Sequence, residues 1–363
     1  MMIYLDYNAT TPCAPEVVEA MQPYFGTVFG NPSSLHPFGA AAEKAVRRAA
    51  EQVAKLICAE PEQILFTGSA TESNNHAIRN APPGELLLTT AEHASLYEPA
   101  RLRGSVRLVP PCPEAIIAAA STGTALAALN LANHETGELL PEPERIARRL
   151  RERGIPLHFD ATQAVGKLPV DVRLLGCDSM AFSAHKLYGP KGVGVLYLRE
   201  PERFRPLLTG GGQQRGLRAG TLDVPGIAGL GKAAELVRFP SSAPRDRFEA
   251  CLACSGIPHR IAGTGHARLP QTCCVLFPGQ DGMKLVALLG EAGVAVSSGS
   301  ACSSGGLSRI LLAAGADPVA AAGALRVSFG LHSTVREAET AADIILETIR
   351  KHQTPGVIDV GSY

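Results

Sequence analysis

The residue pair with the clearest chemical meaning in this sequence is a lysine and an aspartate 26 positions apart. Lys186 lies in segment 183–192, where serine, histidine, glycine and proline neighbours favour a tight turn over a helix interior. Asp160 ends a short apolar run. A turn lysine can form a Schiff base with pyridoxal phosphate, and an acid at a strand end can keep the pyridine nitrogen protonated, so that the ring accepts electrons. A lone lysine is usually a solvated surface charge, but this pair in this order favours the cofactor site.

A phosphate site is expected where residues 67–71 lead from a strand through a Gly- and Ser-rich turn into a helix. Backbone N–H groups at such a helix start, together with the Thr71 hydroxyl, can bind an anion. Ordinary helix caps have the same pattern, so this signal is weak alone. Ser183 and His185 would reach the same phosphate if Lys186 held the ring, which strengthens the interpretation.

Two other polar residues follow strand candidates and could contact the ring. Gln163 lies three residues after Asp160 and could donate to the ring hydroxyl. His93 follows the strand candidate 85–90, where a flat side chain could stack on the pyridine face. A lone histidine is more often an ordinary polar residue.

A second chemical centre is predicted far along the chain. Cys302 lies among serines and glycines in segment 296–306, which favours an exposed loop and makes the thiol available as a nucleophile. An incidental loop cysteine is the alternative. Arg326 stands in an otherwise apolar run, where a bidentate guanidinium suits a substrate α-carboxylate. A structural salt bridge is the alternative for this residue.

Composition narrows the class of protein. The 363 residues carry no net charge and have a pI of about 7.1, which argues against nucleic acids or anionic membranes as partners. No apolar run is long enough to span a bilayer, and nine cysteines without a secretory signal indicate a reducing compartment. The spacing 251–254 indicates helix packing more than a metal site, and no metal is expected. We expect a cytoplasmic protein.

Short apolar runs alternate with amphipathic stretches, which is typical of an α/β protein with a largely parallel sheet. We expect a large α/β domain over residues 16–239 and a smaller α+β domain from residues 1–15 and 240–363, which carries the Cys302 loop and Arg326. Helices are predicted at 40–57, 139–154 and 227–237. Strands are predicted at 63–67, 85–90, 125–131, 155–159, 179–183, 194–198, 273–277 and 294–296.

Several motifs in one order resemble those of the cysteine desulfurases of the iron–sulfur-cluster and nitrogenase type. These are pyridoxal-phosphate enzymes of the class V aminotransferase superfamily, with fold type I. The motifs are residues 4–11, 30–34, 183–192, 210–221 and 297–302, and the likeness continues to Arg326. The cysteine loop has the form of the subgroup in which that loop is long and mobile.

The resemblance implies roles for residues around the cofactor. Lys186 would form the Schiff base, Asp160 would contact the pyridinium nitrogen, and Gln163 would face the ring hydroxyl. His93 would stack on the ring and shuttle protons. His134 stands where an asparagine usually touches the cofactor, so function should persist with altered ring electronics. The phosphate would be held by Ala70, Thr71, Ser183 and His185, and by Thr221 of the other subunit, which implies a homodimer.

The resemblance also implies the substrate and the reaction. Arg326 would bind the carboxylate of L-cysteine, with Asn31 and Asn133 in the substrate-binding set. Cys302 would take the sulfur as a persulfide and pass it to an acceptor protein, for which an iron–sulfur scaffold is one candidate. Two alternatives remain open: a selenocysteine lyase or other β-lyase that does not need Cys302, and a non-catalytic partner in a sulfur pathway.

Overall fold

The computed structural model describes residues 2–298 and 307–352. The chain divides into a larger unit, Tyr7–Pro240 with Gly263–Pro270, and a smaller one, Met1–Asp6 with Ser241–Ala262 and Gln271–Tyr363. This division differs from the expected one in residues 7–15, residue 240 and residues 263–270. Residues 7–15 join the larger unit because their backbone is bonded to the lysine segment, for example from Thr11 N to His185 O (2.9 Å). Residues 263–270 also belong to the larger unit, because their backbone is hydrogen-bonded to it, for example from Leu269 N to Gly137 O (2.7 Å).

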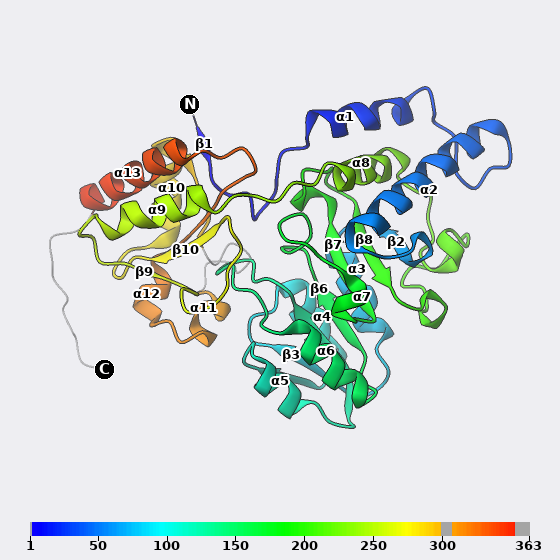
Figure 1. The fold of residues 1–363 in the computed structure, drawn as a ribbon, viewed down its shortest axis with the longest axis horizontal. Coiled ribbons are helices and arrows are strands. Elements are labelled where there is room, and N and C mark those ends of the chain that lie inside the picture. The colour runs from blue at the N-terminus through cyan, green and yellow to red at the C-terminus, as the bar shows by residue number, and fades with distance from the viewer. Residues whose placement is uncertain (1, 299–306, 353–363) are drawn as a thin grey trace. The chain divides into compact units, whose positions relative to one another are not determined.

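A seven-stranded sheet in the order β2-β8-β7-β6-β5-β3-β4 forms the centre of the larger unit (Figure 1). Only β8 runs antiparallel to its neighbours, so the predicted, largely parallel sheet is confirmed. Its strands are almost entirely buried, as expected for a sheet covered on both faces. The strands are β2 Ile64–Thr67, β3 Glu85–Thr89, β4 Val106–Val109, β5 Thr124–Asn130, β6 Leu157–Asp160, β7 Ser179–Ser183 and β8 Gly194–Leu198.

Helices flank this sheet through one apolar face each. In α2, Ala42, Ala49 and Val53 are buried while the intervening charged residues are exposed. Helix α6 begins at Pro143, later than predicted, because proline favours the first turn of a helix. The helices are α1 Pro15–Met21, α2 Pro37–Ile57, α3 Ala70–Asn80, α4 Ala94–Arg103, α5 Pro113–Ala119, α6 Pro143–Glu152, α7 Val172–Leu175 and α8 Val224–Glu235.

The smaller unit has the predicted α+β composition. An antiparallel sheet in the order β12-β10-β9 and a parallel pair, β1-β11, pack with helices around Phe248, Phe277 and Phe329. None of the helices in the described ranges has the length and apolar character that crossing a membrane requires. The elements are β1 Ile3–Tyr4, α9 Ala243–Ala253, β9 Arg260–Ile261, β10 Thr272–Leu276, α10 Gly282–Glu291, β11 Val294–Ala295, α11 Arg309–Ala313, α12 Pro318–Ala322, β12 Ala324–Ser328 and α13 Val335–His352.

One edge of the large sheet collects the ends of the strands that carry the predicted site. Thr67, the last residue of β2, and Ser183, the last of β7, both pair with Gly194, the first of β8. Asp160 pairs with Ala181 on β7 and with Asn130 on β5. The loops after β2, β5, β6 and β7 therefore leave the sheet at the same edge, where ligands bind in open α/β sheets.

Candidate active site

Lys186 ends a single 3₁₀ turn, Ala184–Lys186, that directly follows β7. Its Nζ atom donates to the carbonyl oxygens of Asn8 (2.5 Å) and Ala9 (2.7 Å). The turn is tight because Gly189 packs against Ala184, where a Cβ at position 189 would lie 2.9 Å from the Ala184 carbonyl oxygen. The segment thus presents its amine from a rigid turn, as the sequence pattern predicted.

Asp160 ends β6, beside the strand that leads to Lys186, and its side chain is buried. Asn74 Nδ2 donates to Oδ2 (2.8 Å), and the backbone N–H of Thr162 donates to Oδ1 (2.9 Å). No lysine, arginine or histidine forms an ion pair with this carboxylate in the described part of the chain. A buried anion without an ion-pair partner suits a cationic group bound next to it.

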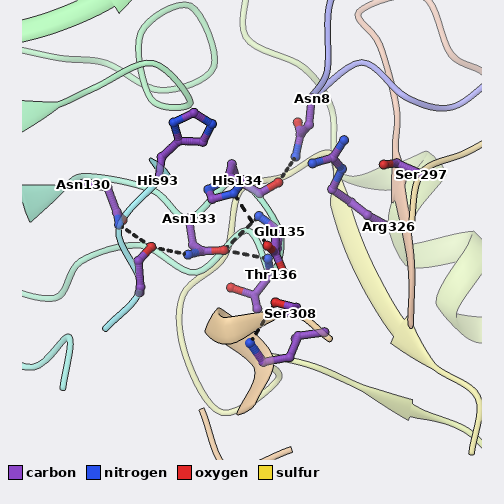
Figure 2. Close-up of polar contacts among 12 residues, drawn as sticks. Asn8, His93, Asn130, Asn133, His134, Glu135, Thr136, Ser297, Ser308 and Arg326 are labelled. Atoms are coloured by element: carbon purple, nitrogen blue, oxygen red, sulfur yellow. Dashed lines mark hydrogen bonds and ion pairs between the residues drawn. The ribbon is translucent and has the colours of Figure 1, made fainter. Parts of the chain in front are cut away.

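His93 caps the start of α4, where its Nδ1 accepts from the backbone N–H of Ser95 (3.0 Å). Its ring meets that of His134 edge to face, with centroids 4.8 Å apart and an interplanar angle of 80°; both residues are drawn in Figure 2. His134 belongs to the loop after β5, and its Nε2 lies 3.7 Å from Oε1 of Glu135. The chain therefore places two imidazoles in contact at the edge where the ring is expected.

Asn133, predicted to bind substrate, uses its side chain within the protein (Figure 2). Its Nδ2 donates to the carbonyl of Ala91 (3.0 Å), and its Oδ1 accepts from the backbone N–H groups of Glu135 (2.8 Å) and Thr136 (2.9 Å). These bonds shape the loop that carries His134. In this geometry Asn133 affects the site by shaping the loop that carries His134, and its side-chain hydrogen bonds are made within the protein.

Gln163, predicted to face the ring hydroxyl, is also bonded at both ends of its amide. Its Nε2 donates to Asn8 O (3.0 Å), and its Oε1 accepts from the ammonium of Lys167. Lys167 is buried and also reaches Asn8 Oδ1 (3.4 Å). Sequence reasoning missed Lys167 and the contacts of Asn8, because residues 163–167 form no helix, and Asn8 is 155 residues from Gln163.

The predicted phosphate cradle lies at the start of α3. Ser69 caps the helix by accepting from Glu72 N (3.1 Å), and the N–H groups of Ala70 and Thr71 lie in the first turn, outside the helical hydrogen-bond ladder. Gly194 allows close packing here, since a Cβ at that position would lie 2.4 Å from the Ser69 carbonyl carbon. This is a donor set suited to an anion.

The remaining cradle residues lie around the same edge. His185 contacts Thr10 Oγ1 (3.1 Å), and its burial, with the nearby Lys186, lowers its pKa to about 4. Ser183 Oγ donates to Val193 O (3.2 Å). Thr221 is exposed and lines a cavity of about 230 Å³ together with Gly68 and Arg218.

The residues predicted to bind substrate do not all belong to the larger unit. Arg326 lies on β12 in the smaller unit, where its Nη2 donates to Asp6 Oδ1 (2.8 Å) and its backbone pairs with Ser297. The structural salt bridge named as the alternative for this residue is therefore present. Asn31 is exposed and accepts from Ser33 N (3.0 Å). Cys302 lies outside the described residues.

The residues present fit pyridoxal phosphate. A buried carboxylate without an ion pair suits the pyridinium nitrogen, a turn lysine suits the carbonyl carbon, an imidazole pair suits the ring face, and a helix start beside Gly194 suits the phosphate. Each of these groups comes from a different element along one sheet edge.

Comparison with known proteins extends these observations. A family model described as aminotransferase class-V matches residues 3–340. The chain is 39% identical to a cysteine desulfurase of Trichormus azollae, over 96% of this chain and 93% of that protein. Among solved structures it is similar to a NifS-like protein (TM-score 0.88, 32% identity, 97% of this chain and 100% of the other). It is also similar to SspA in complex with cysteine (TM-score 0.80, 33% identity, 92% and 100%).

Proposed function

Because the chain belongs to the class-V aminotransferase family, we propose that it is a cysteine desulfurase that uses pyridoxal phosphate. The observation that carries the proposal is the buried Asp160 carboxylate at the same sheet edge as the Lys186 turn. The family is generally dependent on this cofactor, and the relatives similar over nearly the whole chain are cysteine desulfurases. SspA, a structural relative, is described in complex with cysteine, which supports L-cysteine as the substrate class.

Bound pyridoxal phosphate supplies an electron sink for the negative charge that develops at the substrate Cα. The chain's own residues then have separate tasks. Asp160 would keep the pyridine nitrogen protonated, and the start of α3 with His185 would hold the phosphate. Lys186 Nζ would accept the proton from the substrate Cα, and His93, whose Nδ1 accepts from Ser95 N–H, would donate a proton from Nε2. Arg326 binds the substrate carboxylate.

The sulfur step needs a thiolate, which we assign to Cys302. The Cys302 sulfur forms an S–S bond with the substrate sulfur, the substrate C–S bond breaks, and its electron pair stays with the carbon skeleton. Protonation of that skeleton gives alanine, and the persulfide is passed to an acceptor protein. Burial raises the pKa of the thiols of Cys13, Cys58, Cys177 and Cys251, which makes these cysteines poorer nucleophiles.

We also propose that the protein forms a homodimer and lies in the cytoplasm. Thr221 is exposed at the rim of the cavity beside the α3 start, and there it would contact the phosphate held by the second subunit. The acceptor is a protein that takes persulfide sulfur, with an iron–sulfur scaffold as one candidate.

The first test measures alanine released from L-cysteine under reductant. The wild type and Cys254→Ala should both produce alanine, because Cys254 is exposed at the C-cap of α9 and has no part in the site. Cys302→Ala should fail on cysteine. Equal alanine from all three proteins would favour a selenocysteine lyase or other β-lyase that does not need Cys302. No alanine from the wild type would refute the desulfurase.

A second test addresses the cofactor. The protein mixed with pyridoxal phosphate is reduced with borohydride, digested and mapped by mass spectrometry. We expect the cofactor on the peptide containing Lys186 in the wild type and in Lys191→Arg, a change to an exposed lysine of the same segment. Lys186→Arg should give no labelled peptide. Label on another lysine would refute the assignment.

A further inference from the structure

Asn74, a residue that the sequence does not single out, connects two predicted cofactor residues through one buried amide. It lies on α3, and its side chain is completely buried. Its Nδ2 donates to Asp160 Oδ2 (2.8 Å) and to Ser95 Oγ (2.8 Å). Its Oδ1 faces His158 Nε2 at 2.9 Å. All three polar contacts of this amide are therefore with groups in or next to the candidate site.

The Asp160 carboxylate accepts from Asn74 Nδ2, so the amide oxygen Oδ1 must face His158, which lies on β6 two residues before Asp160. An amide oxygen only accepts hydrogen bonds, so the Nε2 of His158 must carry the hydrogen that Asn74 Oδ1 receives. Burial lowers the pKa of His158 to about 4, so the ring is neutral near pH 7 and its Nδ1 has a lone pair. That Nδ1 accepts from the hydroxyl of Ser179 (2.8 Å). The reverse orientation of Asn74 would turn its Oδ1 toward the Asp160 carboxylate and place two acceptors face to face.

The second branch leads from the same amide to His93. Ser95 Oγ accepts from Asn74 and is left with its own hydrogen, which points to His93 Nδ1 at 2.8 Å. The backbone N–H of Ser95 donates to the same nitrogen. His93 Nδ1 is therefore an acceptor from two donors, and the neutral ring carries its proton on Nε2.

We propose that Asn74 is a positioning residue for the desulfurase reaction: one amide, bonded to His158, keeps Asp160 an acceptor toward the cofactor nitrogen and orients the Ser95 hydroxyl that donates to His93 Nδ1. This inference rests on the proposed function for its role in turnover, but the hydrogen-bond pattern itself belongs to the protein alone. The Asn74 amide thus connects Asp160, which would face the cofactor nitrogen, to His93, the residue assigned to proton transfer. Loss of Asn74 should therefore alter both together.

The test compares variants that differ in donor capacity at two positions. Asn74→Asp puts a second carboxylate beside Asp160 and removes the donor, and Asn74→Ala removes both branches. His158→Gln keeps an N–H for Asn74, whereas His158→Leu does not. Asn80→Ala is the matched control, because Asn80 also lies on α3 but bonds only to His76 O and to the backbone of Arg205.

Two readouts apply to the protein with bound cofactor. Asn74→Asp, Asn74→Ala and His158→Leu should bind pyridoxal phosphate roughly 10- to 100-fold more weakly, the range for lost hydrogen bonds to a charged group. The pH titration of the cofactor's absorption band should shift in the same variants, and kcat should fall more than KM rises. His158→Gln and Asn80→Ala should stay close to the wild type.

A third readout needs neither cofactor nor turnover. In protein labelled with ¹⁵N-histidine, the nitrogen shifts should show His93 and His158 as Nε2–H rings. In Asn74→Ala, His158 should lose this preference, whereas His93 should keep it through the Ser95 backbone N–H. If a variant at position 74 does not fold, the His158→Gln and His158→Leu pair decides the matter. Wild-type affinity and titration in folded Asn74→Asp, or Nδ1–H rings in the wild type, would overturn the inference. Absence of alanine production by a wild type with these shifts would count against the desulfurase only.

Discussion

The guanidinium of Arg326 and the carboxylate of Asp6 form an ion pair at 2.8 Å across the smaller unit, although 320 residues separate them in the sequence. The Arg326 side chain is 6% exposed and that of Asp6 is 21% exposed, so the pair is largely withdrawn from water. The backbones of Asp6 and Ser328, which lies two residues after Arg326, also form a bridge. The segment that follows β1 thus holds the arginine that we assign to the substrate carboxylate.

Asp6→Asn should therefore weaken both folding and substrate binding. Removing one partner of a buried pair costs about 3–5 kcal/mol, and the partial exposure of Asp6 reduces this to about 2 kcal/mol. The KM for L-cysteine should rise while kcat changes less, because the arginine keeps its charge but loses its anchor. Urea unfolding and steady-state kinetics measure the two effects. An unchanged KM in a destabilised protein would limit the pair to a structural role.

His134→Asn restores the residue usual in the resembling family and removes the ring that meets His93 edge to face. Loss of an aromatic contact should lower the unfolding free energy by about 1 kcal/mol. Turnover should persist within about tenfold, since asparagine can also donate a hydrogen bond, and the cofactor absorption maximum should shift. Loss of all activity would show that the imidazole itself takes part in proton transfer.

Much of the fold could be predicted from apolar runs bounded by turn residues. The strands predicted at 179–183 and 194–198 coincide with β7 and β8, because both are buried along their whole length and end at a turn. Strand β4 was not predicted. It is the sheet's last strand, and Arg107 and Leu108 are exposed on it, which removes the apolar signal.

The candidate site was predictable where residue type carries the chemistry, as for Lys186 and Asp160. Asn74 was not predictable, because an asparagine on a helix is ordinary and its partner Asp160 is 86 residues away. The same holds for Asn8, whose carbonyl oxygen accepts a hydrogen bond from Lys186, 178 residues away in the sequence. Such contacts depend on strand order and register, which local sequence patterns do not specify.

Glu92 should make stability depend on pH. It is completely buried beside His93, and its Oε1 accepts from the Thr89 hydroxyl (2.6 Å). Burial raises its pKa to about 8, so between the unfolded pKa and this value the folded protein keeps a proton that the unfolded chain has released. The stabilisation is complete at low pH and is lost as pH rises toward 8.

The test compares the wild type with Glu92→Gln, which does not titrate. The unfolding free energy of the wild type minus that of Glu92→Gln should fall by about 1 kcal/mol per pH unit between about pH 5 and about pH 7.5. Denaturant titrations of both proteins at several pH values give this difference. A difference that is constant, or that grows with pH, would contradict a protonated Glu92.

Gly194→Ala should disturb the phosphate cradle specifically. A Cβ there would lie 2.4 Å from the Ser69 carbonyl carbon and 2.8 Å from the Ala70 nitrogen, so the start of α3 must move. Overpacking of this kind costs about 1–3 kcal/mol of stability. Because Ala70 N–H is one of the groups expected to face the phosphate, the affinity for pyridoxal phosphate should fall at least about tenfold, equivalent to about 1.4 kcal/mol.

The control for this prediction is Gly123→Ala in the turn before β5, where the only atom within 4 Å of an added Cβ is Ser121 Oγ at 3.8 Å. Both variants are titrated with pyridoxal phosphate and unfolded with urea. Gly123→Ala should keep wild-type affinity. If Gly194→Ala loses stability but binds the cofactor as tightly as the control does, the anion binds away from the start of α3, because a shifted helix start could not leave its own ligand undisturbed.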